Sequence, residues 1–365
     1  MRLLWLLAGI LLASACGSAA ALNYRVETVA KGLEHPWSLA FLPDGRMLVT
    51  ERAGRLRVIQ DGRLLDEPVR GVPAAHVRSQ AGLFEVLLDP DYEENGWIYL
   101  SLAHGTAAAN STRVIRGRLR DHALQDVEVL FTAAPLRSTS VHYGGRMAFL
   151  ADGTLVVGLG DAFDLREDAQ RLDSHTGKIV RIHRDGSVPA DNPFVGQAGA
   201  LPEIYSYGHR NVQGLVFDPE SGMLWAHEHG PRGGDEVNLI QPGRNYGWPV
   251  ATFGVDYSGA RISPYTSRPG MEDPRVDWTP SIAPSGMALY HGEQFPEWQG
   301  DLLVTALVAR EVRRVSLDGE RVTGEQTLFR EIGERLRDVK VGPDGALYLL
   351  TDLPRGRVLR ISAAR

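Results

Sequence analysis

One phrase recurs along this chain and limits its fold more than any other feature. It consists of an apolar pair, a short turn containing Asp-Gly, and alternating apolar residues, as at 39–49, 147–157 and 339–349. Looser copies run through 86–100, 215–225 and 287–304. Asp-Gly between β-rich runs is typical of a hairpin, because the central turn residues need positive φ. The phrase therefore predicts repeated antiparallel hairpins.

The spacing of the copies indicates how the hairpins assemble. A unit that recurs at roughly 50–60 residues is typical of four-stranded blades around a channel. Residues 22–365 hold six such units of about 57 residues each. No linker or composition break divides the chain, so we expect one all-β domain, a six-bladed β-propeller, rather than a pair of β-sandwiches. Functional residues should then fall just before or after strands, where the loops of several blades meet.

The composition excludes several classes of protein. The single Cys16 rules out a disulfide framework and a multi-cysteine metal site. The formal net charge of −6 provides no basic field for nucleic acid. Small-molecule chemistry is therefore the better expectation.

The amino end is typical of an export signal. Arg2 precedes an apolar run at 3–12, and small residues follow at 13–21. This order predicts a secretory signal over 1–21 and an exported, periplasmic protein. The apolar run is too short to span a bilayer.

The same segment also resembles a lipoprotein cleavage box at 13–17. In that interpretation the signal ends at Ala15, and Cys16 carries a lipid that anchors the protein to a membrane. The alternative is simple cleavage after Ala21, which leaves a mature protein without cysteine.

Two polar loops precede predicted strands. His142 opens the loop 142–146, and a histidine there can act as a base because its ordinary pKa of about 6.5 lies near working pH. The alternative is a histidine packed against a neighbouring blade. Arg210 and Asn211 present donors that suit a carboxylate or a quinone oxygen. For this pair the alternative is a solvated surface turn.

The segment 227–236 resembles a metal-binding loop. His227 and His229 make a zinc site conceivable. However, the glycines and the proline of the loop expose backbone carbonyls, and Asp235 and Glu236 add carboxylates. Oxygen donors of this kind suit Ca²⁺ better than Zn²⁺. A polar loop without an ion is the remaining alternative.

Near the carboxyl end, Arg335 and Arg337 stand two residues apart, which places both on one face of a strand. Two like charges side by side are costly unless an anion lies between them. A polyanionic ligand is one explanation of the pair, and solvent exposure is the other.

Four longer segments carry a resemblance to a known family. They are 202–211, 227–236, 245–249 and 280–287. With them the chain resembles the glucose/sorbosone dehydrogenase family, especially its aldose sugar dehydrogenase branch, from about Leu33 to Arg360. The resemblance implies an exported six-bladed propeller that uses pyrroloquinoline quinone (PQQ) and calcium (Ca²⁺). Such an enzyme oxidises aldose sugars at the anomeric carbon to lactones, and its electrons leave through an acceptor protein or a quinone.

The resemblance also implies roles for single residues. His142 matches the general base, which takes the proton of the anomeric hydroxyl while hydride passes from C1 to the quinone C5. The implied cofactor-binding residues are Gln80, Arg210, Asn211, Tyr257, Arg335 and Arg337. One calcium is implied at the Glu236 side chain and the Tyr246 carbonyl. A second, touching PQQ, is implied at the carbonyls of Gly230 and Pro231.

Two departures from the family pattern keep other functions open. Glu85 adds a carboxylate that would repel PQQ if it faced the channel and would be harmless if it faced solvent. Val308 stands where the family has a cofactor-binding lysine, and Arg310 is a candidate substitute. The alternative function is therefore a non-enzymatic propeller that binds a sugar or a protein in a degraded cofactor pocket. A calcium-dependent lactonase is a third hypothesis, although such a site needs a ring of side-chain oxygens rather than carbonyls.

Overall fold

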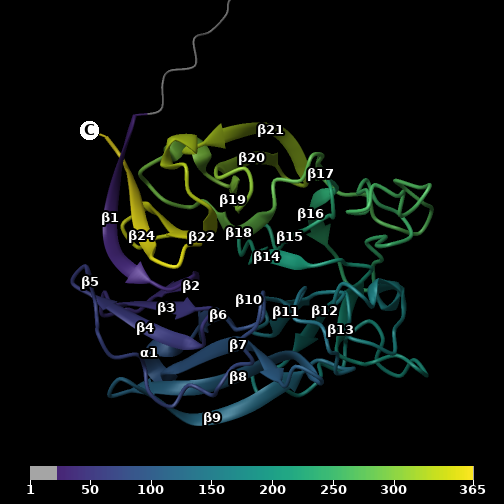
Figure 1. Cartoon of the computed structure of the whole chain (residues 1–365), viewed down its shortest axis with the longest axis horizontal. Coiled ribbons are helices and arrows are strands. Elements are labelled where there is room, and N and C mark those ends of the chain that lie inside the picture. Colours follow the sequence, from purple (N-terminus) through teal and green to yellow (C-terminus); the bar gives the residue numbers. More distant parts are fainter. Residues whose placement is uncertain (1–22, 365) are drawn as a thin grey trace, which may run out of the picture.

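The computed structural model describes residues 23–364 and contains six four-stranded antiparallel sheets. The innermost strand of each sheet lies toward a common centre, where neighbouring innermost strands contact one another (Figure 1). The predicted six-bladed β-propeller is therefore confirmed. The signal predicted over 1–21 and the lipid site at Cys16 lie outside the described residues. Within 23–364 no helix has the length and apolar character needed to cross a membrane.

The blades follow one another along the chain, and each runs from its inner strand to its outer strand. Blade 1 contains β2 (Pro36–Phe41), β3 (Met47–Glu51), β4 (Arg55–Gln60) and β5 (Arg63–Leu64). Blade 2 contains β6 (Leu83–Leu88), β7 (Trp97–Gly105), β8 (Asn110–Arg120) and β9 (Ala123–Thr132). Blade 3 contains β10 (Gly144–Phe149), β11 (Leu155–Leu159), β12 (Lys178–Ile182) and β13 (Ile204–Tyr207).

Blades 4 and 5 repeat this order, and the helical elements between strands are short. Blade 4 contains β14 (Val212–Phe217), β15 (Leu224–Glu228), β16 (Asp235–Ile240) and β17 (Val276–Trp278). Blade 5 contains β18 (Pro284–Leu289), β19 (Leu302–Ala306), β20 (Val312–Asp318) and β21 (Arg321–Leu328). The helical elements are α1 (Tyr92–Asn95), η1 (Arg166–Gln170), η2 (Pro296–Trp298) and η3 (Arg330–Ile332).

Blade 6 joins the two ends of the described chain. Its inner strands are β22 (Leu336–Val341), β23 (Leu347–Thr351) and β24 (Gly356–Ala363). Its outer strand is β1 (Tyr24–Leu33), which pairs antiparallel with β24 (Figure 1). This pairing closes the ring, a feature that the sequence analysis did not predict.

The three Asp-Gly phrases form hairpin turns, as predicted, but of another type. Only the glycine of each turn has a positive φ: 86° at Gly45, 76° at Gly153 and 73° at Gly345. The aspartate instead accepts a hydrogen bond from the backbone N–H two residues on, as Asp44 Oδ1 does from Arg46 N at 3.1 Å. This Asx turn leaves the aspartate at an ordinary φ, so the expectation of positive φ at both residues was wrong.

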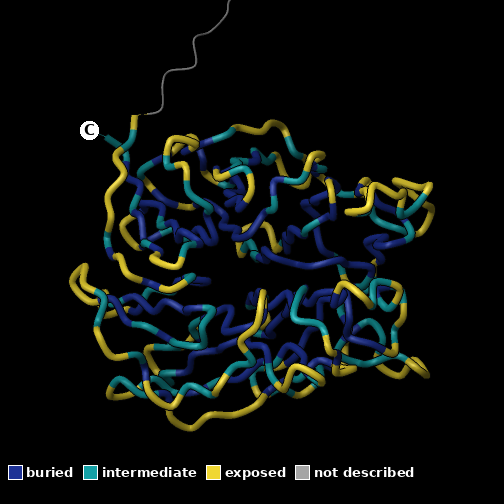
Figure 2. The backbone as a smooth tube through the Cα atoms, viewed as in Figure 1, coloured by how far each residue is buried: buried dark blue, intermediate teal, exposed yellow. Residues whose placement is uncertain are grey.

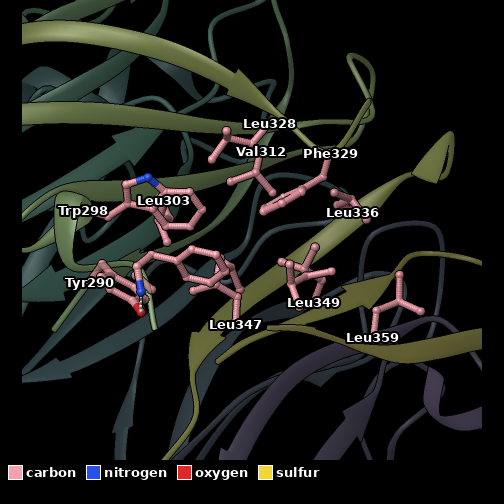
Figure 3. Close-up of a cluster of buried hydrophobic side chains, with 14 residues drawn as sticks. Tyr290, Trp298, Leu303, Val312, Leu328, Phe329, Leu336, Leu347, Leu349 and Leu359 are labelled. Atoms are coloured by element: carbon pink, nitrogen blue, oxygen red, sulfur yellow. Dashed lines mark hydrogen bonds between the residues drawn. The ribbon is translucent and has the colours of Figure 1, made fainter. Parts of the chain in front are cut away.

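The core lies between the blades. Figure 2 shows buried backbone through the interior and exposed residues along the outer edges and loops. Each of the six large apolar clusters combines side chains from two adjacent blades. In the cluster between blades 5 and 6, Trp298 and Leu303 pack with Leu347 and Leu349 (Figure 3). Because β-sheets bury apolar faces in pairs, this packing holds the blades in their circular order.

One buried arginine connects all six blades. Arg146 on β10 donates to the carbonyls of Gln213 on β14 at 2.9 Å and Ser285 on β18 at 2.6 Å. Its Nη2 also donates to the carbonyl of Arg337 on β22 at 3.2 Å. The guanidinium carbon lies 4.0 Å from the centroid of the Trp37 ring on β2. The sixth contact is with a carboxylate on β6.

The carboxylate on β6 is Glu85. Its Oε2 lies 3.1 Å from Arg146 Nη1, and its Oε1 lies 3.0 Å from Lys340 Nζ. The Asp338 carboxylate completes the group at 3.0 Å from Arg146. Burial raises the pKa of Glu85, but Lys340 and Arg146 outweigh it and hold that pKa below its ordinary value. Glu85 thus faces the channel with its charge balanced. The sequence analysis considered only a repulsive carboxylate in the channel or a harmless one in solvent.

Replacement of Arg146 tests the energetic weight of this network. Arg146→Met leaves Glu85 and Asp338 buried with Lys340 as their one remaining cation in the group, and we expect a loss of about 3–5 kcal/mol in the free energy of unfolding. Arg321→Met, which removes an exposed ion pair with Asp318, should cost less than about 1 kcal/mol. Chemical denaturation of both variants gives the comparison. Equal losses would show that the network adds nothing beyond a surface pair.

Candidate active site

A cavity of about 210 Å³ lies at one end of the channel. Every blade contributes a residue within one position of the start of its innermost strand: Trp37, Phe84, Gly144, Asn211, Ala283 and Arg337. Four blades add the residue that directly follows their second strand: Arg52, His229, Leu307 and Asp352. Gln80, Tyr143, Gln213 and Arg335 complete the lining. We call this the first cavity; its lining lies beside strands, where functional residues were expected.

Three arginines and one carboxylate set the charge of the first cavity. Asp352 Oδ2 lies 2.6 Å from Arg337 and 3.8 Å from Arg335. Arg52 lies in the same wall without an ion pair to any residue in 23–364. Arg335 and Arg337, whose spacing predicted that they share one face, therefore both line the first cavity. The excess of positive charge suits an anion.

His142 is buried and lines neither cavity itself, but its chain neighbour Tyr143 lines the first cavity and its partner Asp161 lines the second. Its position is held from two sides. Its backbone N–H donates to Gln80 Oε1 at 2.9 Å. Its Nδ1 lies 2.6 Å from Asp161 Oδ1. When Nδ1–H donates to that carboxylate, Nε2 is left as the free acceptor, which is the arrangement of a general base.

The surroundings of His142 favour the neutral imidazole. Burial lowers its pKa, the Asp161 carboxylate opposes this effect, and the charges of Arg210 and Arg137 lower the pKa further. The net shift is downward. Near neutral pH the ring is therefore able to accept a proton.

Asp161 was missed by the sequence analysis. Its Oδ2 accepts a hydrogen bond from Trp248 Nε1 at 2.9 Å, so the carboxylate is itself fixed. The hairpin register contains the signal: Gly144 pairs with Leu159. His142 lies two residues before Gly144, and Asp161 lies two residues after Leu159. The two side chains therefore stand opposite each other across the hairpin.

Arg210 and Asn211 point to different spaces. Asn211 lines the first cavity, where its Oδ1 accepts from Gly144 N at 3.2 Å. Arg210 lines a second cavity and donates through Nη1 to the carbonyls of His229 at 2.9 Å and Gly230 at 2.7 Å. The pair therefore bridges the two cavities rather than facing one of them.

The second cavity, of about 270 Å³, combines aromatic and charged side chains. Its lining is Asp161, Phe163, Asp164, Arg166, Arg210, Pro231, Trp248, Asp256, Tyr257 and Ile262. Tyr257 stacks on Phe163 with ring centroids 6.3 Å apart, and Phe163 meets the His142 ring edge-on at 5.3 Å. Tyr257, predicted to line the cofactor pocket, thus lines this second cavity.

The predicted calcium ligand Glu236 lies in a buried acidic pair. Glu236 on β16 stands opposite Glu228 on β15, and Asn238 Nδ2 lies 3.3 Å from both carboxylates. Burial, followed by the charge of Glu228, raises the pKa of Glu236 well above its ordinary value. The Asn238 Oδ1 atom is buried without a partner among the described residues. This oxygen set fits a cation.

The other predicted ligands lie near this pair or near Arg210. Tyr246 stacks on His209 at 4.7 Å, and the His209 ring is bonded to Glu228 at 2.9 Å. Pro231 lines the second cavity, and the Gly230 carbonyl accepts from Arg210. Within 23–364 no three His, Cys, Asp or Glu side chains form a metal-binding group, so the zinc interpretation of 227–236 gains no support.

Ser206, His209 and Glu228 form a hydrogen-bonded row that resembles a hydrolase triad. His209 Nε2 lies 2.9 Å from Ser206 Oγ, and Nδ1 lies 2.9 Å from Glu228 Oε1. All three side chains are buried, and none lines either cavity. Glu228 also accepts from the backbone N–H of Arg210. The row therefore positions the Arg210 loop rather than a nucleophile.

Val308, which raised doubt about the cofactor, and Arg310, its candidate substitute, lie outside both cavities. Val308 is 62% exposed. Arg310, the candidate substitute for a lysine, donates to the Gly333 carbonyl at 3.2 Å. Neither side chain supplies a charge to the first cavity.

Comparison with known proteins agrees with this geometry. The family model described as Glucose / Sorbosone dehydrogenase matches residues 33–360. The chain is 44% identical over 359 residues to the aldose sugar dehydrogenase YliI of Escherichia coli (strain K12), covering 97% of this chain and 96% of that protein. The apo-form structure of the soluble aldose sugar dehydrogenase from Escherichia coli is 43% identical, with a TM-score of 0.90, covering 94% of this chain and all of that one.

A cofactor-bound structure is also similar. The PQQ-bound form of an aldose sugar dehydrogenase from Streptomyces coelicolor is 30% identical, with a TM-score of 0.75, covering 93% of this chain and 99% of that one. The match of the family model extends over nearly all of the described residues. The resemblance seen in the sequence is thus confirmed, and the chain is an enzyme of the glucose/sorbosone dehydrogenase family.

Proposed function

We propose that this enzyme oxidises aldose sugars at the anomeric carbon to lactones with PQQ and Ca²⁺, using His142 as the base. The observation that carries the proposal is the His142–Asp161 pair, held between an arginine-rich cavity and a second, mixed cavity. The alternative of a binding module with a degraded pocket rested partly on Glu85, whose charge is balanced by Arg146 and Lys340. Within 23–364 no ring of acidic side chains supports a lactonase.

The first cavity fits PQQ by charge and by surface. Arg335, Arg337 and Arg52 offer more positive charge than Asp352 balances, which suits the carboxylates of the cofactor. Trp37 and Phe84 add aromatic faces to the same cavity, which suits a flat ring system. When bound, PQQ supplies the quinone that takes up the hydride leaving the sugar carbon. Gln80 and Asn211 lie at the His142 side of the cavity and are the polar groups available to orient it.

The second cavity fits a sugar. Phe163 and Tyr257 offer aromatic faces for the C–H surface of a pyranose, and Asp164, Arg166 and Asp256 offer partners for hydroxyl groups. His142 Nε2 then takes the proton of the anomeric hydroxyl as the C1 hydride departs, and Asp161 stabilises the imidazolium that forms. The proton and the hydride together account for the two-electron oxidation of the sugar to the lactone.

Calcium is proposed at the Glu236 side chain and the Tyr246 carbonyl. The buried Glu228–Glu236 pair and the unpartnered Asn238 Oδ1 support a cation there, because Ca²⁺ prefers several oxygen ligands. An ion at the carbonyls of Gly230 and Pro231 stays a prediction from the sequence. The Gly230 carbonyl accepts from the Arg210 guanidinium, which such an ion would meet at close range.

The cellular setting is proposed from the sequence alone. A secretory signal over 1–21 supports export to the periplasm, either as a free protein or with a lipid on Cys16. The electrons leave through an acceptor protein or a quinone.

Substitution of His142 separates chemistry from cofactor binding. His142→Ala should reduce sugar oxidation about 10²–10⁴-fold, because the proton acceptor is lost, while the affinity for PQQ changes little. Dye reduction in the presence of PQQ, Ca²⁺ and an aldose measures the first quantity, and quenching of tryptophan fluorescence by PQQ measures the second. His183→Ala, which alters an exposed histidine, is the control. Full activity of His142→Ala would remove this residue from the mechanism.

The pH dependence tests the role of Asp161. Protonation inactivates the base, so activity should fall as the pH drops through a His142 pKa that lies below about 6.5. Asp161 raises that pKa. Asp161→Asn should therefore move the acidic limb of the pH–rate profile to lower pH and also reduce kcat, since the tautomer is no longer fixed. An unchanged limb would mean that another group titrates.

Removal of metal tests the calcium site. Treatment with a chelator should lower the melting temperature and the occupancy by PQQ together, and added Ca²⁺ should restore both. In Glu236→Gln the melting temperature should no longer respond to Ca²⁺, because the carboxylate ligand is lost. A wild-type protein insensitive to chelation would contradict the assignment.

A further inference from the structure

A third arginine enters the wall of the first cavity from blade 1. Arg52 directly follows β3, and its backbone is held on both sides. Its N–H donates to the His35 carbonyl at 3.1 Å, and its own carbonyl accepts from Leu83 N at 3.3 Å. A Cβ at Gly82 would lie 1.9 Å from that carbonyl, so glycine is required at this contact. The position of Arg52 is therefore fixed by two blades.

The Arg52 side chain carries charge that the protein does not neutralise. Asp352, the one carboxylate of the cavity lining, is bonded to Arg337 and to His35 Nδ1. The Arg52 guanidinium makes no hydrogen bond or ion pair with any residue in 23–364, although the side chain is half-buried. Burial lowers the pKa of Arg52; the Asp352 carboxylate opposes this effect, and the charges of Arg337 and Arg335 add to it, so that the net shift is downward. Three guanidinium groups thus repel one another around one carboxylate.

Within residues 23–364 no other lysine or arginine lines this cavity. Arg310 is bonded to the Gly333 carbonyl and is absent from the lining. Lys340 and Arg146 form ion pairs with Glu85 and Asp338 in the channel. A ligand with several carboxylates would meet Arg335, Arg337 and Arg52 and no further positive side chain among the described residues.

We infer that Arg52 is a third anion-binding residue of the first cavity, pairing with a carboxylate of PQQ beside Arg335 and Arg337. This inference rests on the proposed function. It assigns to blade 1 a charged contact with the cofactor in addition to the Trp37 ring. It also gives a reason for an unpaired, half-buried arginine, because anion binding relieves the repulsion among the three guanidinium groups.

Binding of PQQ to metal-loaded apoprotein tests the inference. Arg52→Gln should raise the Kd for PQQ about tenfold to a hundredfold, the loss expected for one charge-assisted contact. Arg52→Lys keeps the charge and should retain most of the affinity. Arg63→Gln, at an exposed position of the same blade, should bind as the wild type. Fluorescence titration or calorimetry gives each Kd without any need for turnover.

The stability of the unliganded protein gives a second, independent readout. Removal of one of three like charges should raise the melting temperature of apo Arg52→Gln by about 1 °C. A residue with a merely structural role would lower it. The inference thus expects weaker PQQ binding together with a more stable apoprotein.

Three outcomes would overturn the inference. They differ in whether the proposed function also fails. If Arg52→Gln binds PQQ as the wild type while Arg335→Gln binds weakly, Arg52 is no ligand residue and the proposed function stands. If Arg52→Gln and Arg52→Lys both lose affinity and apo stability, the role is structural. If the folded wild type binds no PQQ, the proposed function fails and the role of Arg52 fails with it.

Discussion

The ring of blades depends on one guanidinium group at its centre. Arg146 reaches the inner strands of the other five blades through carbonyls, carboxylates and the Trp37 ring. A guanidinium has five N–H donors in a plane, and no other side chain offers so many fixed directions. The apolar clusters hold each blade to its neighbours, whereas Arg146 relates all six at once. Together with Lys340 it balances the charges of Glu85 and Asp338, so the centre of the channel is filled by a buried, charge-balanced plug.

This plug determines what the end of the channel can do. Its charges are internally balanced, so the arginines above it keep their charge for a ligand. The lining of the site comes mostly from the strands of the ring. Residues near the starts of the innermost strands and just after the adjacent strands converge on the cavity. His142 and Asp161 come from one hairpin, and Trp248 from the next blade fixes the carboxylate.

Sequence reasoning found the hairpins, the number of blades and the positions of His142, Arg335 and Arg337, because each follows from local spacing. It did not find contacts between distant segments. Glu85 was weighed as facing either the channel or solvent, since nothing local shows that Arg146 and Lys340 meet it. Arg52 was recoverable in principle: in the repeat it holds the same place as Asp352, three residues after the copies at 39–49 and 339–349. Tyr257 lay beyond such reasoning, because its loop has no counterpart in the other blades.

The seam between β1 and β24 has a consequence for how the protein is made. It joins strands from opposite ends of the described chain, so closing it costs loop entropy on the order of 5 kcal/mol. That cost is met only when the last strand is present. A chain synthesised or threaded from its amino end therefore stays an open arc of blades, with β1 unpaired, until its final residues arrive.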